Sequence, residues 1–321
     1  MSILIYAEQQ NGKVAKSAKE LASYAKAYAD KTGQDVVAVG AGLEDADSLF
    51  QYGVSKVLNV NDETLKTFNA FAHSQMVAQA ADQQGSGLIL ISDSNDAVYM
   101  GSILADKLEA GYVSHVIGLP EDGGNFTVKR KVFSNKGIAY TEVLSDKKLL
   151  RLAKNSFGII ENPVSGSVED FKPEIDKSVY ETYKITKVDK ATGKVSLSDA
   201  DIIVSAGRGL KGPENWGMIE ELAEVLGAAT ACSKPVADIG WRPHTEHVGQ
   251  TGKQVAPNLY IAIGISGAIQ HLAGVNGSKN MLVINNDPEA PFFKAADYGV
   301  VGDAFEVVPN LIEKLKAFKN Q

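Results

Sequence analysis

The sequence predicts an α/β protein of two domains, each with a mostly parallel sheet flanked by helices, and a doubly wound C-terminal domain. Short apolar runs without polar alternation recur along the chain, as in parallel strands buried on both faces. Helix-like segments separate these runs in the βαβα order that builds a parallel sheet. A length of 321 residues exceeds what one ordinary core fills and suits two domains.

The first part of the chain carries the first βα series. Apolar runs predict buried strands, and segments with apolar residues at helical spacing predict the helices between them. Gly33 closes the first helix, because glycine suits the left-handed C-cap. The strands are expected at residues 2–7, 35–40, 56–60 and 87–92, and the helices at residues 15–32, 68–84 and 97–109.

The pattern changes in the middle of the chain. Residues 127–143 alternate apolar and polar side chains around Asn135-Lys136-Gly137, which predicts a hairpin. Residues 157–188 are loop-rich, although residues 179–188 alternate again as a strand does. The polar, turn-rich stretch 187–199 predicts the domain boundary. The N-terminal domain is therefore expected at residues 1–199 and the C-terminal domain at residues 200–321.

A second βα series fills the C-terminal domain. Its first strand runs directly into a glycine-rich turn, and its last helix is amphipathic. The strands are expected at residues 201–205, 259–264, 281–285 and 298–302, and the helices near residues 215–226, 268–273 and 305–318.

Composition excludes several classes of protein. Hydrophobic residues make up 44% of the chain, enough for sizeable cores, so a disordered chain is excluded. A net charge of -7 without a Lys/Arg-rich run argues against nucleic acid as a partner. Cys232 is the single cysteine, which rules out an intrachain disulfide and argues against a thiolate metal site. No secretion signal and no membrane-length apolar run are present, so we expect a cytoplasmic protein without membrane insertion.

Glycines and polar residues follow the strands of the C-terminal domain, where open parallel sheets bind ligands. Arg208 stands between two glycines and offers a fork of donors to a phosphate or carbonyl oxygen. The GxGxxG fingerprint is absent, and a solvated arginine in a tight turn explains this pattern equally well. Val248-Gly249-Gln250-Thr251 can form an anion nest or an ordinary surface turn.

The strongest signal is the strand–turn–helix pattern of residues 259–273. It places a helix start at the end of a strand, where a pyrophosphate can bind, and Ser266 can donate to a phosphate oxygen. His271 lies in the first turns of that helix. A lone helical histidine is usually structural, but this position favours ligand contact. Asn285 and Asp303 follow the next two strands.

Together these segments resemble the electron transfer flavoprotein alpha subunit. LYIAIGISGAIQHLAGVNGSKNMLVINNDPEAP, residues 259–291, is similar to the signature of that family. SAGRGLKGPENW, VGQTGKQVAPNLY and ADYGVVGDAFEVVP match the same family in the same order. The resemblance is dense from about residue 201 to the end and looser before it, where it depends on ILIYAE and the α/β pattern.

The resemblance implies an FAD-binding C-terminal domain and an N-terminal domain that packs against a beta subunit and binds no cofactor. It also implies AMP in the beta subunit, or a second FAD in bifurcating members. Thr251 and His271 fall near the isoalloxazine. The residues placed at FAD are Arg208, Ser233, Lys234, Val248, Gly249, Gln250, Thr251, Ser266, Gly267, Ala268, Ile269, Gln270, His271, Asn285, Asp303 and Ala304.

Lys234 departs from the family pattern, which usually has arginine after the serine at this position. Cations and N–H donors near the flavin favour negative charge on it, and His271, Arg208 and Lys234 are the candidates. Lys234 either faces the flavin or turns to solvent and leaves the role to another cation, such as Arg242.

The implied function is that of an electron carrier in a heterodimer. It would accept electrons from flavin dehydrogenases, such as the acyl-CoA dehydrogenases of fatty acid beta-oxidation, and pass them to a quinone oxidoreductase or another acceptor. The sequence shows no nucleophile–base–acid set, so we predict no catalytic residue and no metal ligand. Two alternatives stay open: the alpha subunit of an electron-bifurcating complex that oxidises NADH, and a stand-alone nucleotide-dependent oxidoreductase.

Overall fold

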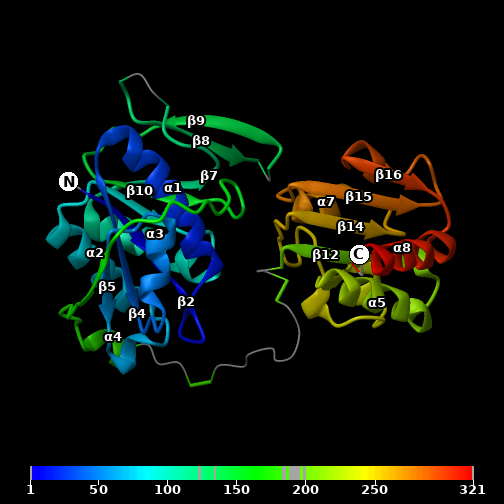
Figure 1. Ribbon diagram of the computed structural model, residues 1–321, viewed down its shortest axis with the longest axis horizontal. Coiled ribbons are helices and arrows are strands. Elements are labelled where there is room, and N and C mark those ends of the chain that lie inside the picture. Colours follow the sequence, from blue (N-terminus) through cyan, green and yellow to red (C-terminus); the bar gives the residue numbers. More distant parts are fainter. Residues whose placement is uncertain are drawn as a thin grey trace. The chain divides into compact units, whose positions relative to one another are not determined.

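The chain folds into two compact units, Met1–Val188 (unit 1) and Asp189–Gln321 (unit 2). The computed structural model describes residues 2–121, 124–133, 135–182, 186–187, 196–197 and 200–319. Each unit is a parallel or mostly parallel sheet flanked by helices, which confirms the predicted fold class (Figure 1). The boundary expected between residues 199 and 200 stays a prediction, because both neighbouring stretches 188–195 and 198–199 lie outside the described residues.

Unit 1 is built on one large sheet. Its described strands follow the order β11-β5-β4-β1-β6-β10-β7-β8-β9, parallel from β11 to β7 and antiparallel from β7 to β9. A small hairpin of β2 (Gln9–Gln10) and β3 (Lys13–Val14) follows the first strand. The sheet strands are β1 (Ser2–Tyr6), β4 (Asp35–Ala41), β5 (Lys56–Val60), β6 (Leu88–Ile91), β7 (Gly111–Val116), β8 (Thr127–Val132), β9 (Gly137–Glu142), β10 (Lys148–Leu152) and β11 (Ser167–Asp170).

Helices cover both faces of this sheet. Leu21 of α1 is buried on one face, and Met76 of α2 and Leu104 of α3 are buried on the other. Gly33 ends α1 in the left-handed conformation, as predicted. The helices and 3-10 turns of unit 1 are α1 (Lys16–Thr32), η1 (Ala46–Tyr52), η2 (Glu63–Leu65), α2 (Ala70–Gln84), α3 (Asn95–Leu108) and α4 (Ser178–Thr182).

One expectation in unit 1 is wrong. The alternation of residues 179–188 indicated a strand, but α4 begins this stretch, and residues 183–185 and 188 lie outside the described residues. The side chain of Asp176 accepts a hydrogen bond from the Ser178 backbone at 2.9 Å, and the Asp176 carbonyl accepts one from Val179 at 3.2 Å. These local bonds start a helical turn, which overrides the alternating pattern.

Unit 2 holds a fully parallel sheet in the order β13-β12-β14-β15-β16. Numbered within the unit, this is the doubly wound order 2-1-3-4-5. The strands are β12 (Ile202–Ala206), β13 (Ala229–Cys232), β14 (Leu259–Ile263), β15 (Asn280–Asn285) and β16 (Tyr298–Val301). All except β13 were expected from the sequence.

The helices of unit 2 also lie on two faces. Figure 1 shows α5 and α8 beside each other, and they pack with Val204, Ile261 and Ile263 on one face. Leu272 of α7 packs with Tyr260 on the other face. The helices and 3-10 turns are η3 (Arg208–Leu210), η4 (Pro213–Trp216), α5 (Gly217–Leu226), α6 (Lys234–Asp238), η5 (His244–Glu246), α7 (Ile269–Val275), η6 (Pro291–Lys294) and α8 (Ala304–Lys319).

In each sheet the first strand of the unit lies between strands that follow it in opposite directions, so the strand order reverses beside it. In unit 2 the second strand, β13, lies on one side of β12 and the later strands on the other, so the reversal falls between β12 and β14. In unit 1 it falls between β1 and β6. Open α/β sheets bind ligands beyond the carboxyl ends of their strands at such a point. This side of each sheet is called its carboxyl end.

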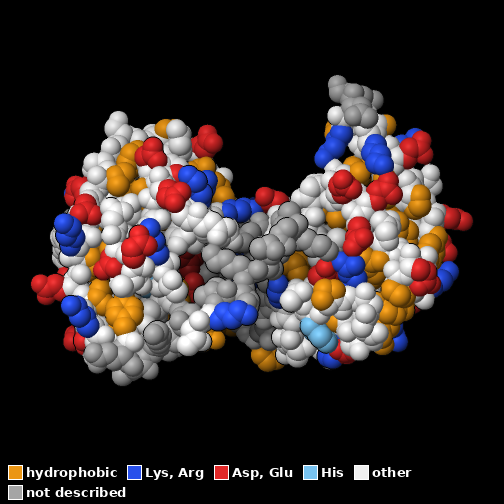
Figure 2. All heavy atoms as spheres, turned by 90° about the horizontal axis from the view of Figure 1, so that it is seen from below, with side chains coloured by type: hydrophobic (Ala, Val, Ile, Leu, Met, Phe, Trp, Pro, Cys, Tyr) orange, Lys and Arg blue, Asp and Glu red, His pale blue; other side chains and the backbone are white. Residues whose placement is uncertain are grey.

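The surface mixes charges of both signs. On the face drawn in Figure 2, acidic and basic side chains are interspersed over each unit, with hydrophobic side chains between them. Among the described residues, no helix combines the length and the apolar character that are needed to cross a membrane.

Candidate functional site

Two glycine turns touch at the strand reversal of unit 2. The Gly209 N–H donates to the Gly264 carbonyl at 3.1 Å. A Cβ on Gly207 would lie 2.2 Å from the Gly264 oxygen, and Gly264 itself has φ +60. Glycine is therefore required where the two turns touch, because a Cβ there would clash with the backbone. Arg208 is exposed on the turn, and within the described part of the chain its side chain makes no ion pair or hydrogen bond.

The turn after β14 is held by backbone contacts with Phe292, and most of its residues are exposed. Gly267 has φ +86, and a Cβ on it would lie 2.5 Å from the Phe292 nitrogen. That N–H donates to the Ser266 carbonyl at 3.1 Å. The residues Ser266, Ala268, Ile269 and Gln270 are exposed. The turn therefore presents the Ser266 hydroxyl and the first N–H groups of α7, which have no partner within the helix.

Asn285 and Asp303 lie at the carboxyl end of the sheet, but their side chains shape neighbouring turns. Asn285 is buried and donates from Nδ2 to the Ile265 carbonyl at 3.0 Å. Asp303 accepts from the Phe305 N–H at 2.9 Å at the start of α8, and its second oxygen is 3.9 Å from Lys211 Nζ. Ala304 is buried in the first turn of α8. Asn285 and Asp303 therefore stabilise the turns that border the candidate site.

The segment 248–251 is attached to the same end of the sheet. The Val248 N–H donates to the Cys232 carbonyl at 3.1 Å, and the Gln250 N–H donates to the Gln270 carbonyl at 2.7 Å. A Cβ on Gly274 would lie 2.5 Å from Gly249 Cα, so the segment lies directly against α7. Gln250 and Thr251 are exposed. Two polar side chains are thus presented beside the turn after β14.

Lys234 is engaged at the surface. Its Nζ lies 2.6 Å from Asp238 Oδ2 one helical turn away, and its side chain is 56% exposed. Ser233, just before it, is buried, and its N–H donates to the Ala206 carbonyl at 3.1 Å. Arg242, the other cation considered, is held by Glu246 at 2.8 Å and by Glu220 at 2.9 Å. Of the three cations considered near the site, only Arg208 is without an acidic partner among the described residues.

His271 is buried against Tyr260. The distance from Tyr260 Oη to His271 Nε2 is 2.9 Å, and the Tyr260 ring stacks on Phe292. Burial lowers the pKa of His271 to about 4; the positive charge of His247 adds to this effect and the backbone of Val248 opposes it. His271 is therefore neutral at pH 7. Its Nδ1 is buried without a hydrogen-bond partner among the described residues.

Sequence reasoning missed Tyr260 and Ser205. Tyr260 is fully buried in β14, and Ser205 is fully buried in β12. Tyr260 pairs with Ile203, so Ser205 is the next residue of β12 on the same face. Among the described residues the Ser205 hydroxyl makes no hydrogen bond of ordinary geometry. Burial raises the pKa of Tyr260, and the nearby Ser205 hydroxyl opposes that shift. The available sequence signal was the Ser205 hydroxyl within the otherwise aliphatic strand β12, IIVSA.

The predicted site residues of unit 2 therefore come together. They lie at the carboxyl ends of the parallel strands or on the segment 248–251 that is bonded to them. Their contacts with a cofactor stay a prediction.

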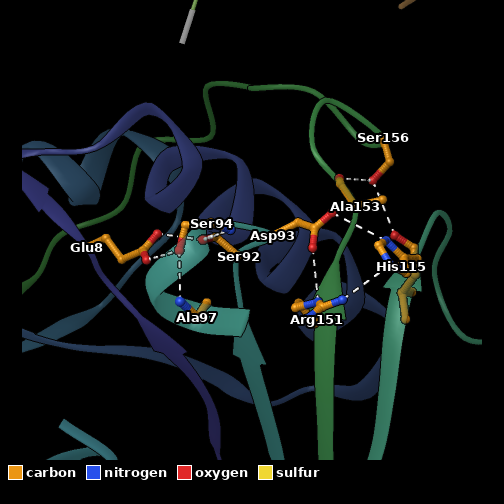
Figure 3. A network of polar contacts seen from close by, with 10 residues as sticks. Glu8, Ser92, Asp93, Ser94, Ala97, His115, Arg151, Ala153 and Ser156 are labelled. Carbon is orange, nitrogen blue, oxygen red and sulfur yellow. Dashed lines mark hydrogen bonds and ion pairs between the residues drawn. The ribbon is translucent and has the colours of Figure 1, made fainter. Parts of the chain in front are cut away.

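The carboxyl end of unit 1 is filled by its own side chains (Figure 3). Glu8 follows β1 and is half-buried, and its carboxylate accepts hydrogen bonds from Ser92 and Ser94. It also accepts one from Ser17. Burial raises the pKa of Glu8, and the serine hydrogen bonds oppose that shift. The Ser94 hydroxyl also accepts from the Ala97 N–H at 3.0 Å and so caps α3.

A second network joins three strands of unit 1 (Figure 3). Asp93 is 3.0 Å from Arg151 Nε and 3.3 Å from His115 Nδ1, and Arg151 Nη2 is 3.2 Å from His115 Nε2. A guanidinium only donates, so His115 accepts at Nε2 and donates from Nδ1. Burial alone would raise the pKa of Asp93, but His115, Arg151 and Lys154 together hold it below its usual value.

Comparison with known proteins agrees with this division. Residues 3–176 match the electron transfer flavoprotein domain, and residues 196–276 match the electron transfer flavoprotein FAD-binding domain. The electron transfer flavoprotein subunit alpha of Syntrophomonas wolfei is 36% identical over 316 residues, which cover 97% of this chain and 98% of that protein. The subunit alpha of Bacillus subtilis is 39% identical, with 87% and 86% covered. The mitochondrial subunit alpha of Arabidopsis thaliana is 30% identical, with 98% and 90% covered.

Proposed function

The chain belongs to the family of electron transfer flavoprotein alpha subunits, and on that basis we propose that it binds FAD at the carboxyl end of the unit 2 sheet and carries electrons. The main supporting observation is unused hydrogen-bonding capacity at the strand reversal. Within the described part of the chain His271 Nδ1 is buried without a partner, which costs about 1–3 kcal/mol unless a ligand or a rearrangement satisfies it. FAD, with an anionic pyrophosphate and a carbonyl-bearing ring, suits the donors present there.

The donors divide between the two parts of FAD. The Ser266 hydroxyl and the first N–H groups of α7 would hold the pyrophosphate. The glycines after β12 and β14 would let the cofactor approach the backbone closely. Thr251 and His271 would lie near the isoalloxazine. When bound, FAD supplies the redox chemistry, and the protein orients and tunes it.

The charge state of His271 limits its role. With a pKa lowered to about 4 by burial, it is neutral at pH 7 and can offer an N–H group but no positive charge. Lys234 is paired with Asp238. Arg208 is therefore the cation that we infer to stabilise negative charge on the cofactor.

We further infer a heterodimer with an electron transfer flavoprotein beta subunit that holds AMP, or a second FAD in a bifurcating complex. Electrons would come from flavin dehydrogenases, such as the acyl-CoA dehydrogenases of fatty acid beta-oxidation, and pass to a quinone oxidoreductase or another acceptor. The setting that we propose is the cytoplasm. The resemblance over both units supports this assignment.

Co-expression with the beta subunit tests the proposal. We expect a yellow 1:1 complex with stoichiometric FAD in unit 2 that an acyl-CoA dehydrogenase reduces in the presence of its substrate. Ser266→Asp should abolish FAD binding while circular dichroism stays unchanged, because a carboxylate would face the pyrophosphate. Ala317→Asp, which adds the same charge to an exposed position of α8, should retain FAD.

Three results would change the assignment. Full FAD occupancy in the Ser266→Asp complex would remove this turn from the site. A complex without FAD would end the proposal itself. NADH oxidation by the complex, coupled to two different acceptors, would identify the bifurcating alternative.

A further inference from the structure

Three polar side chains form a buried line across unit 2. Ser205 on β12, Tyr260 on β14 and His271 on α7 are 0%, 0% and 7% exposed. The Tyr260 hydroxyl is 2.9 Å from His271 Nε2, and the Tyr260 and His271 rings both pack on Phe292. Water cannot reach the phenol, so its hydrogen must be shared with a protein group.

The neutral imidazole of His271 allows two arrangements. A neutral ring carries one hydrogen, so one nitrogen donates and the other accepts. If the Tyr260 hydroxyl donates to Nε2, the ring hydrogen is on Nδ1. If Nε2 donates to the phenol oxygen, the Tyr260 hydrogen must point elsewhere and Nδ1 is a bare acceptor.

The neighbours of the line favour the first arrangement. Among the described residues, His271 Nε2 is the hydrogen-bond partner of the buried Tyr260 hydroxyl. If the phenol accepted from Nε2, its own hydrogen would be buried without an acceptor, which costs about 1–3 kcal/mol. The Tyr260 hydroxyl therefore donates to Nε2, and the ring hydrogen of His271 lies on Nδ1.

We propose that Tyr260 is a positioning residue whose hydroxyl fixes His271 in the Nδ1–H tautomer and thereby makes it a donor toward the flavin. This inference rests on the proposed function, which places the isoalloxazine near His271 and the adjoining segment 248–251. The carbonyl oxygens and unprotonated nitrogens of an isoalloxazine accept hydrogen bonds. In the Nε2–H tautomer, Nδ1 carries a lone pair and no hydrogen. It would repel these flavin acceptors, whereas Nδ1–H would donate a hydrogen bond to them.

Tyr260→Phe isolates the hydroxyl, because phenylalanine keeps the ring that stacks on Phe292. The complex with the beta subunit and FAD is labelled with ¹⁵N-histidine, and the ring-nitrogen shifts of His271 are measured. The wild type should show a hydrogen on Nδ1, and Tyr260→Phe should show a mixture of tautomers. Tyr298→Phe is the control, since Tyr298 is 64% exposed on β16.

The flavin potential provides the second measurement. Tyr260→Phe should change the one-electron equilibrium of the FAD about three- to tenfold, the effect of one hydrogen bond; tenfold corresponds to about 59 mV. In a His271→Gln background, Tyr260→Phe should change the potential no further, because it acts through His271. A merely structural role for Tyr260 would give additive effects.

The outcomes separate the two proposals. A wild-type complex that binds no FAD would contradict the proposed function, whatever the tautomer. A complex that holds FAD but has the hydrogen on Nε2 would overturn the role of Tyr260, even if Tyr260→Phe failed to fold. Unchanged shifts and an unchanged potential in a folded, FAD-loaded Tyr260→Phe complex would overturn it as well.

Discussion

At the strand reversal of unit 1, Glu8 lies against the hydroxyls of three serines. At that of unit 2, by contrast, Gly207 lies against Gly264, and His271 Nδ1 has no partner among the described residues. Both places lie beyond the carboxyl ends of parallel strands, where ligands bind. In unit 1 a carboxylate of the chain already accepts the available donors. In unit 2, among the residues that the structure describes, His271 Nδ1 and the Arg208 side chain make no hydrogen bond. The same architecture therefore closes one end and leaves the other ready for a cofactor.

The charged side chains at the two carboxyl ends also differ in whether they are paired. In unit 1, Asp93 is paired with Arg151, which also donates to His115. In unit 2, Arg208 has no ion pair among the described residues. Unused donors and an unpaired cation, more than sheet topology, distinguish the candidate cofactor site.

Acidification should affect the two units alike and give the largest effect. His73 in unit 1 and His271 in unit 2 are both buried, and burial lowers the pKa of each from 6.5 to about 4. Below pH 6.5 the unfolded chain binds a proton that the folded unit does not. The free energy of unfolding should therefore fall between pH 6.5 and 4, by about 3 kcal/mol for each histidine.

Hydrogen exchange of core amides, read separately in each unit, measures this loss. His73→Gln should flatten the pH dependence in unit 1 alone, and His271→Gln should flatten it in unit 2 alone. A dependence that persists in both variants would assign the acid sensitivity to other groups.

Glu8→Ala should have an intermediate effect that is confined to unit 1. It leaves the hydroxyls of Ser17, Ser92 and Ser94 without their acceptor and opens a small cavity, which should cost about 2 kcal/mol of stability. Glu8→Gln, which keeps an acceptor oxygen, should cost less. FAD occupancy should stay unchanged in both, as absorbance would show. Loss of FAD would show that the carboxyl end of unit 1 affects FAD binding by unit 2.

Lys234→Ala should have the smallest effect. Its partner Asp238 is exposed, and screened surface pairs contribute little to stability. The flavin potential should change less than it does in Arg208→Ala, where an unpaired cation is lost and the potential should fall. Spectroelectrochemistry of the two complexes compares them directly. A larger fall in Lys234→Ala would show that this lysine, despite Asp238, serves the flavin.

Local sequence determined the elements whose patterns are strong and self-contained. The apolar runs of β1, β4 and β5, the glycine that ends α1 and the strand–turn–helix at β14 and α7 were all predicted near their observed bounds. Buried parallel strands need continuous apolar runs, and left-handed caps favour glycine. The family resemblance then indicated the FAD-binding unit, which the matching family model supports.

Only the tertiary structure decided what depends on distant partners. β10 was missed because its place between β6 and β7 is set by pairing across the sheet, and its short run KLLRL says little alone. Arg242 is paired with Glu220 because the fold brings this residue, 22 positions earlier in the chain, within 2.9 Å. Tyr260 reads as an ordinary strand residue until the crossover from β14 to α7 brings His271 to its hydroxyl. A local pattern reports which face a side chain occupies, whereas hydrogen bonds depend on which groups the fold places within about 3 Å of each other.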